Sequence, residues 1–104
     1  MSTVEVLKRA RETISKPERW TQGAYARDAR GYPIGVGHSD AVCFCATGAI
    51  ARGAPDPEAR ALAQMGVRIG RRPVEGLAAW NDAPERTHAE VLAAFDSAIK
   101  RLEK

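Results

Sequence analysis

Residues 41–51 form the longest apolar run of the chain, and this run constrains the fold more than any other feature. It is much shorter than the roughly 20 consecutive apolar residues that a membrane span needs. The run therefore predicts a helix that other elements bury on almost every side, with Ser39 or Asp40 as its cap and Arg52-Gly53 at its end. A chain of 104 residues supplies one such core, so we expect a single domain over residues 1–104.

Three further helices are predicted from local start signals and apolar spacing. A capping box at residues 2–5 opens a helix over about residues 3–16. The order of cap, proline and acid at residues 56–58 opens another, which we expect to end near Met65 because Gly66 follows. A second capping box at residues 87–90 precedes a clear amphipathic stripe and predicts the last helix.

The segments between these helices predict a small hairpin and a long loop. Residues 28–31 have the composition of a tight turn, and the flanking arms, about residues 22–27 and 31–35, are too short to be a stable sheet by themselves. Residues 67–79 follow no period and predict a loop, with a short helical turn at 77–80. The expected fold class is mainly α: about four helices around a buried central helix, with a small β-hairpin insertion as a minor α+β component.

The charge of the chain indicates which partners to expect. The chain has 16 Lys and Arg against 13 Asp and Glu, a net charge of +3. A dedicated nucleic-acid-binding protein carries a clustered basic surface, so nucleic acid is not an expected partner, and neither is a membrane. Four arginines occur between residues 60 and 72 without an acid. Of these, Arg71 and Arg72 could bind a phosphate or an acidic partner, although a solvated loop is the simpler interpretation.

The two cysteines raise the question of a thiol enzyme. Cys45 stands near the start of the predicted central helix, where the helix dipole lowers the pKa of a thiol. His88 could act as the base, and Asn81 or Asp82 could orient its imidazole. The simpler alternatives are that Cys45 is a small buried hydrophobe and that residues 81–82 form a turn.

A metal site and a disulfide are both unexpected. His38, Cys43, Cys45 and His88 are residue types that bind zinc, but the two cysteines have only one residue between them, whereas structural zinc sites favour two to four. The same short spacing argues against a disulfide. Free thiols agree with a reducing compartment, so we expect a cytoplasmic protein with no metal and no cofactor.

Three short motifs carry a family resemblance. They are W-T-Q-G-A at residues 20–24, F-C-A-x-G-A at residues 44–49, and W-N-D at residues 80–82 followed by T-x-A-E-V at residues 87–91. In this order they resemble an uncharacterised family of small bacterial and phage proteins, a domain of unknown function, over about residues 4–100. The resemblance implies no activity. The positions that match its motifs are Trp20, Gln22, Gly23, Cys45, Gly48, Asn81 and Asp82.

Two functional hypotheses follow. In the favoured one, the chain is a non-catalytic binding or accessory module for an unidentified protein or small molecule. An exposed turn at residues 80–82 and the basic loop would then meet the partner, with Trp20, Gln22, Trp80, Arg71 and Arg72 as candidate binding residues. The alternative is the thiol-dependent enzyme described above. A homo-oligomer is compatible with either, and Gly48 is expected to permit the close approach of another backbone.

Overall fold

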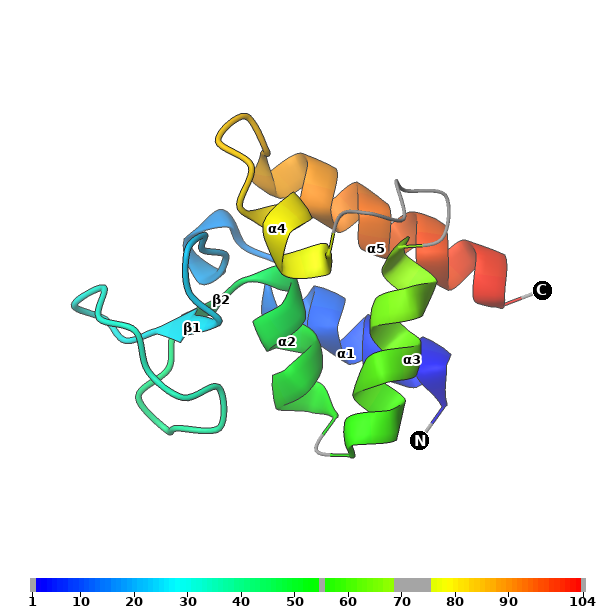
Figure 1. The fold of residues 1–104 in the computed structure, drawn as a ribbon, viewed down its shortest axis with the longest axis horizontal. Coiled ribbons are helices and arrows are strands. Elements are labelled where there is room, and N and C mark those ends of the chain that lie inside the picture. The colour runs from blue at the N-terminus through cyan, green and yellow to red at the C-terminus, as the bar shows by residue number, and fades with distance from the viewer. Residues whose placement is uncertain (1, 55, 69–75, 104) are drawn as a thin grey trace.

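The computed structural model describes residues 2–54, 56–68 and 76–103. Within these ranges the chain is mainly helical, with one short antiparallel pair of strands, which confirms the expected fold class. The elements, shown in Figure 1, are α1 (Thr3–Thr13), the 3-10 helix η1 (Pro17–Arg19), β1 (Ala26–Arg27), β2 (Cys43–Phe44), α2 (Ala46–Gly53), α3 (Pro57–Arg68), α4 (Leu77–Asn81) and α5 (His88–Leu102).

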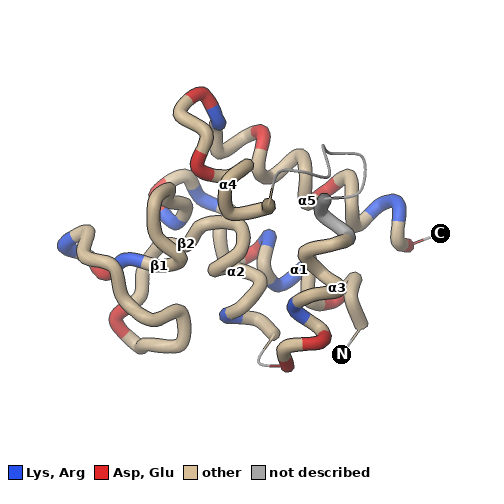
Figure 2. The backbone as a smooth tube through the Cα atoms, in the orientation of Figure 1, with Lys and Arg blue, Asp and Glu red and all other residues tan. Residues whose placement is uncertain are grey.

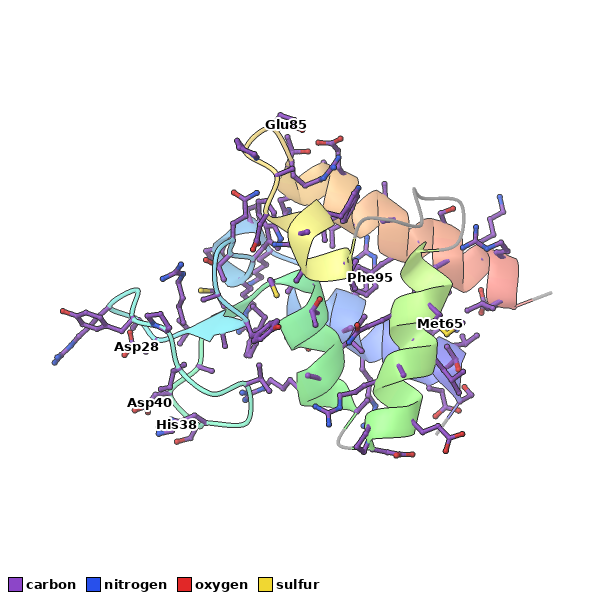
Figure 3. The ribbon with its side chains drawn as sticks, in the orientation of Figure 1. Asp28, His38, Asp40, Met65, Glu85 and Phe95 are labelled. Atoms are coloured by element: carbon purple, nitrogen blue, oxygen red, sulfur yellow. The ribbon has the colours of Figure 1, made fainter. Side chains whose placement is uncertain are left out.

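Helices α1, α2 and α3 pack against one another at the centre of the fold. α1 packs against α2, α3 and α5, and α2 packs against α1, α3 and α4. In Figure 1, α2 and α3 lie side by side in front of α1. Figure 3 labels Phe95, a fully buried side chain of α5. The largest fully buried side chains are Phe95, Leu7, Ile14, Ile50, Val6, Val91, Asn81 and Cys45.

The strand pairing differs from the predicted hairpin. Ala26 pairs with Phe44 and Arg27 pairs with Cys43, so the second strand comes from the apolar run and not from residues 31–35. The predicted second arm contributes only an isolated bridge between Arg27 and Pro33. The turn between the expected arms is confirmed, since Gly31 has a φ of +88° and its N–H donates to the carbonyl of residue 28.

The start of the central helix also differs from its prediction. Neither Ser39 nor Asp40 is its cap, because α2 begins at Ala46 and Cys45 is the N-cap residue. Residues 43–44 are extended because they pair with β1, and a backbone that forms a sheet ladder cannot also be helical. The two cysteines are therefore not on a helix.

The remaining helices follow their predictions with two corrections, of which the first is that α1 ends at Thr13, with Ile14 as its C-cap, and not at residue 16. The capping box of α5 is complete, with both reciprocal hydrogen bonds between Thr87 and Glu90. α3 begins at Pro57 as expected, but it does not end at Gly66 and continues to Arg68. A glycine inside a helix costs only about 1 kcal/mol relative to alanine, which packing can outweigh. The predicted helical turn at 77–80 is α4, and residues 69–75 of the predicted loop lie outside the described residues.

Charges are distributed over the surface with both signs mixed. Figure 2 shows Lys and Arg interspersed with Asp and Glu along the tube. The segment between β1 and β2, which carries Asp28, His38 and Asp40, extends away from the helices in Figure 3. In the part of the chain that the structure describes, none of the helices has the length and apolar character that crossing a membrane requires.

Candidate functional site

Asn81, the last residue of α4, is fully buried and joins three parts of the chain. Its side-chain oxygen accepts hydrogen bonds from the indole Nε1 of Trp20 at 2.7 Å and from the backbone N–H of Ala46 at 3.0 Å. Its Nδ2 donates to the carbonyl of Thr21 at 3.1 Å and to Oδ1 of Asp82 at 3.0 Å. An amide side chain has two donor hydrogens and two acceptor lone pairs, so every polar valence of Asn81 is used.

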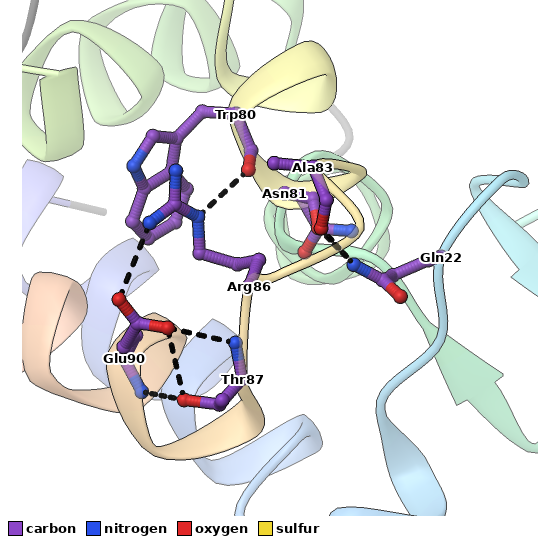
Figure 4. Close-up of polar contacts among 7 residues, drawn as sticks. All are labelled: Gln22, Trp80, Asn81, Ala83, Arg86, Thr87 and Glu90. Carbon is purple, nitrogen blue, oxygen red and sulfur yellow. Dashed lines mark hydrogen bonds and ion pairs between the residues drawn. The ribbon is translucent and has the colours of Figure 1, made fainter.

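Gln22 and Gly23 add a second set of contacts to the same place. Nε2 of Gln22 donates to the carbonyl of Asn81 at 2.8 Å and to that of Ala83 at 2.9 Å, the second of which Figure 4 shows. These carbonyls lie at the end of α4 and two residues beyond it, where a helix leaves its last acceptors without partners. The N–H of Gly23 donates to Oδ1 of Asp82 at 3.0 Å. We call this network the Asn81 junction; its members are residues 20–23, Ala46 and residues 81–83.

Trp80 and Asn81 are not part of an exposed turn. Trp80 is 7% exposed, and the guanidinium of Arg86 covers its ring with Cζ 4.3 Å from the ring centroid. Arg86 also donates from Nε to the carbonyl of Trp80 and pairs with Glu90 (Figure 4). The hydrogen bonds from Thr87, together with the charge of Arg86, lower the pKa of Glu90. Trp80 is therefore a core residue. Its side chain has too little exposed area for the binding role that the sequence predicts.

Cys45 is buried at 2% exposure, and its thiol takes part in the start of α2. Its Sγ accepts a hydrogen bond from the N–H of Gly48 at 3.3 Å, which is the N-cap interaction that a serine would make in other helices. Burial raises the pKa of Cys45, and the charge of Asp82 raises it further, against the lowering effect of the N–H groups of Gly48 and Thr47. The expected lowering of this pKa by the helix start is wrong, because burial outweighs it.

His88 is engaged elsewhere. Its Nε2 lies 2.6 Å from the carbonyl oxygen of Ile14, the residue that caps the end of α1. A carbonyl only accepts hydrogen bonds, so Nε2 carries the proton in this contact. The ring lies 6.0 Å from that of Trp20, between centroids. No hydrogen bond joins His88 to Cys45 in the described ranges. The structure thus brings Asn81 and Asp82 into one hydrogen-bond network that contacts Ala46, the residue after the N-cap Cys45, and His88 is not part of this network.

The other predicted site residues separate into two groups. Trp20 and Gln22 are half-buried and belong to the Asn81 junction through their side chains. Arg71 and Arg72 lie outside the described residues. Among the described residues, no group of three His, Cys, Asp or Glu side chains is arranged to hold a metal ion.

Gly48 permits the close approach that the sequence predicts. A Cβ atom on this residue would lie 1.9 Å from the carbonyl oxygen of Tyr25 and 2.8 Å from its carbonyl carbon. That same carbonyl oxygen accepts a hydrogen bond from the N–H of Cys45 at 3.2 Å. Only a glycine allows the backbone before β1 to rest directly on α2.

A second feature, a groove, lies beside the junction. It has a volume of about 440 Å³ and is formed by the segment 25–36 and the helices α2 and α3. We call it the α2–α3 groove. Small-molecule sites have volumes of about 300–1,000 Å³, so the groove can accommodate a small ligand. Its lining residues are Tyr25, Val36, Thr47, Ala51, Pro57, Arg60, Ala61 and Gln64.

The polar side chains of the groove have no partners among the described residues. Oγ1 of Thr47 is buried without a hydrogen bond. Arg60 and Gln64 are half-buried residues, and Tyr25 is 59% exposed. None of these three side chains makes a hydrogen bond or ion pair within residues 2–54, 56–68 and 76–103. The groove thus contrasts with the Asn81 junction, where the polar groups bind one another.

The sequence motifs did not indicate these groove residues. Tyr25, Thr47 and Arg60 come from three separate segments, and no short spacing connects them. The available signal was Arg60, a cation in the first two turns of a predicted helix. A cation is favoured near the end of a helix and not near its start, which could have marked Arg60 as a residue placed for another reason.

Comparison with models of protein families identifies a family for the chain, while the three motifs stay a prediction. The sequence model of one family matches residues 1–101, and the description of that family is "Family of unknown function (DUF6197)". This confirms the resemblance to a domain of unknown function, whereas the bacterial or phage origin stays a prediction. A search of the curated proteins found no match to the chain, and neither did a search of the solved structures. The match covers nearly the whole chain, which therefore belongs to this family of unknown function, DUF6197.

Proposed function

We propose that the chain is a non-catalytic binding protein whose binding surface is the α2–α3 groove. One observation carries the proposal: the polar groups of the Asn81 junction are paired with one another, while those of the groove have no described partner. A buried polar group without a partner, such as Oγ1 of Thr47, costs stability, and a ligand that supplies the partner recovers it. The motif residues would then stabilise the fold, and the ligand would bind in the α2–α3 groove.

The thiol-enzyme hypothesis receives less support. A nucleophilic cysteine needs a lowered pKa and a base within hydrogen-bond reach. Burial raises the pKa of Cys45 instead. The Nε2 of His88 is occupied by the carbonyl of Ile14, and the amide of Asn81 has no valence left to orient an imidazole. These contacts suit residues that join segments of the fold.

The cytoplasmic location and the partner class belong to the same proposal. Cys43 and Cys45 are both free thiols, which supports a reducing compartment. The mixed surface charge supports a small-molecule or protein partner over nucleic acid.

An amide chemical-shift screen tests the proposal directly. The labelled protein is titrated with a library of small fragments, and the residues whose amide signals move are mapped. We expect the shifts to gather around Val36, Thr47 and Arg60. Shifts that gather around Cys45 and His88 would favour the thiol enzyme, and a library that moves no groove signal would contradict the proposal.

A further inference from the structure

Within the proposed binding function, on which this inference rests, we infer that the α2–α3 groove takes a small organic acid: one carboxylate on a compact apolar body. The argument begins with charge. Of the described residues that line the groove, only Arg60 is charged. Its guanidinium makes no ion pair with any described residue, although two acids, Asp56 and Glu58, lie close to it in sequence. A half-buried cation without a counter-ion favours an anionic ligand.

The single cation also sets the charge of that ligand. A guanidinium forms two parallel hydrogen bonds to a carboxylate, which then carries no excess charge. A phosphate monoester would bring close to two negative charges against one positive charge. The amide of Gln64 stands one turn further along α3 and can donate a further hydrogen bond without adding charge. The groove is therefore matched to a monoanion.

The walls of the groove indicate the rest of the ligand. Val36, Ala51, Pro57 and Ala61 supply an apolar lining, and Tyr25 adds an aromatic ring at one side. Ligand sites combine such a lining with a few placed polar groups that orient the ligand. A volume of about 440 Å³ suits a compact apolar body such as one aromatic ring with a short chain. The carboxylate would pair with Arg60 while this body covers the apolar wall.

The neighbouring arginine provides a structural contrast. Arg52, at the end of α2, donates to the carbonyls of Val36 and His38, and its guanidinium lies 5.0 Å from the ring centroid of Phe44. Its hydrogen-bonding capacity is used to hold the segment before β2. Arg60 has no such task in the described structure, which leaves it available to a ligand.

The test compares an acid with its neutral analogue. Phenylacetate and phenylacetamide have nearly the same shape, and each is titrated into the labelled protein while amide shifts are followed. We expect phenylacetate to move groove signals and to bind about tenfold or more tightly than the amide, as a charge-assisted hydrogen bond implies. Phenyl phosphate, the dianionic comparison, should bind more weakly than phenylacetate.

Substitutions then assign the effect to Arg60. Arg60→Met should weaken phenylacetate binding about tenfold or more, and Arg60→Lys, which keeps the charge, should restore part of the loss. Arg19→Met is the matched control, because Arg19 is exposed on η1 and does not line the groove. Its binding should equal that of the unaltered protein. Melting temperatures of all three variants show whether each one is folded.

The outcomes separate this inference from the proposed function. Equal binding of phenylacetate and phenylacetamide, or binding that Arg60→Met leaves unchanged, overturns the inference but keeps the groove as a binding site. Tighter binding of phenyl phosphate overturns the assignment of a monoanion. If no fragment of either charge moves a groove signal, both the inference and the proposed function fail.

Discussion

Replacing Asn81 with alanine should destabilise the protein strongly, because four hydrogen bonds end on this one side chain. The substitution leaves the N–H of Ala46, a fully buried residue, without an acceptor at the start of α2. It also leaves the half-buried indole N–H of Trp20 without one. An unsatisfied buried polar group costs about 1–3 kcal/mol. We assign about 2 kcal/mol to each of these two donors and nothing to the more exposed groups. The free energy of unfolding should therefore fall by about 4 kcal/mol.

Urea denaturation followed by circular dichroism measures this loss. For an m-value of about 2 kcal/mol/M, a loss of this size lowers the midpoint by about 2 M. Small proteins have only about 5–15 kcal/mol of stability in total, so the variant should be close to unfolding at 37 °C. Circular dichroism is preferred to fluorescence because Trp20 contacts the altered residue.

A matched control separates this network from an ordinary loss of an amide. Gln64 is half-buried and makes no hydrogen bond within the described structure, so Gln64→Ala should change stability by about 0.5 kcal/mol or less. Asn81→Asp removes both donors and places a carboxylate against Asp82, so at pH 7 it should cost at least as much as Asn81→Ala. A loss of under about 1 kcal/mol for Asn81→Ala, similar to that of the control, would refute the reasoning.

Three further predictions follow from single contacts. Gly48→Ala should cost about 3 kcal/mol, because its Cβ would lie 1.9 Å from the Tyr25 carbonyl oxygen; a melting temperature within about 4 °C of the unaltered protein would count against that contact. Gln22→Ala should cost about 1–3 kcal/mol through its two lost hydrogen bonds, and a result equal to Gln64→Ala in the same urea assay would contradict it. The lowered pKa of Glu90 adds stability that is present above the unfolded value of about 4.3. That stability is lost as the pH falls through the lowered pKa, so Glu90→Gln should flatten this part of the curve of urea midpoint against pH.

The helices that the sequence predicted most closely are those with local signals. The capping box of Thr87 and Glu90 opens α5, and Pro57 begins α3, because both signals act between residues less than one turn apart. The close approach at Gly48 was also predictable, since a glycine in a buried helix leaves room for a backbone.

Long-range pairing explains the features that the sequence did not predict. Pairing of residues 43–44 with β1 depends on a partner about 17 residues earlier, and it moved the start of α2 from the expected cap to Cys45. A local pattern does not contain that information. For the same reason, the apolar run at residues 41–51 predicts one continuous helix when its sequence is considered alone.

For the candidate site, too, the sequence indicates which residues take part but not which residues they contact. The motifs contain residues of one network, because hydrogen bonds join Trp20 to Asn81 and Asn81 to Asp82, and Cys45 caps the helix that Asn81 contacts at Ala46. Their role was not predictable, since the hydrogen bond between Trp20 and Asn81 spans 61 positions of sequence. Whether Cys45 is a nucleophile or a cap depends on burial, and burial is set by the packing of distant segments. The groove could not be predicted from a short sequence motif, because its lining residues come from three separate segments.

The rate of alkylation of Cys45 tests the central claim, that the motif residues hold the fold and perform no chemistry. Iodoacetamide is added to the Cys43→Ser variant, so that only Cys45 can react, and the mass of the intact protein is followed with time in buffer and in urea. We expect native labelling to be roughly 100-fold or more slower than labelling of the unfolded chain, because a thiol at 2% exposure reacts only when the fold opens. Rapid, stoichiometric labelling of the native protein would contradict the account and return Cys45 to the role of a nucleophile.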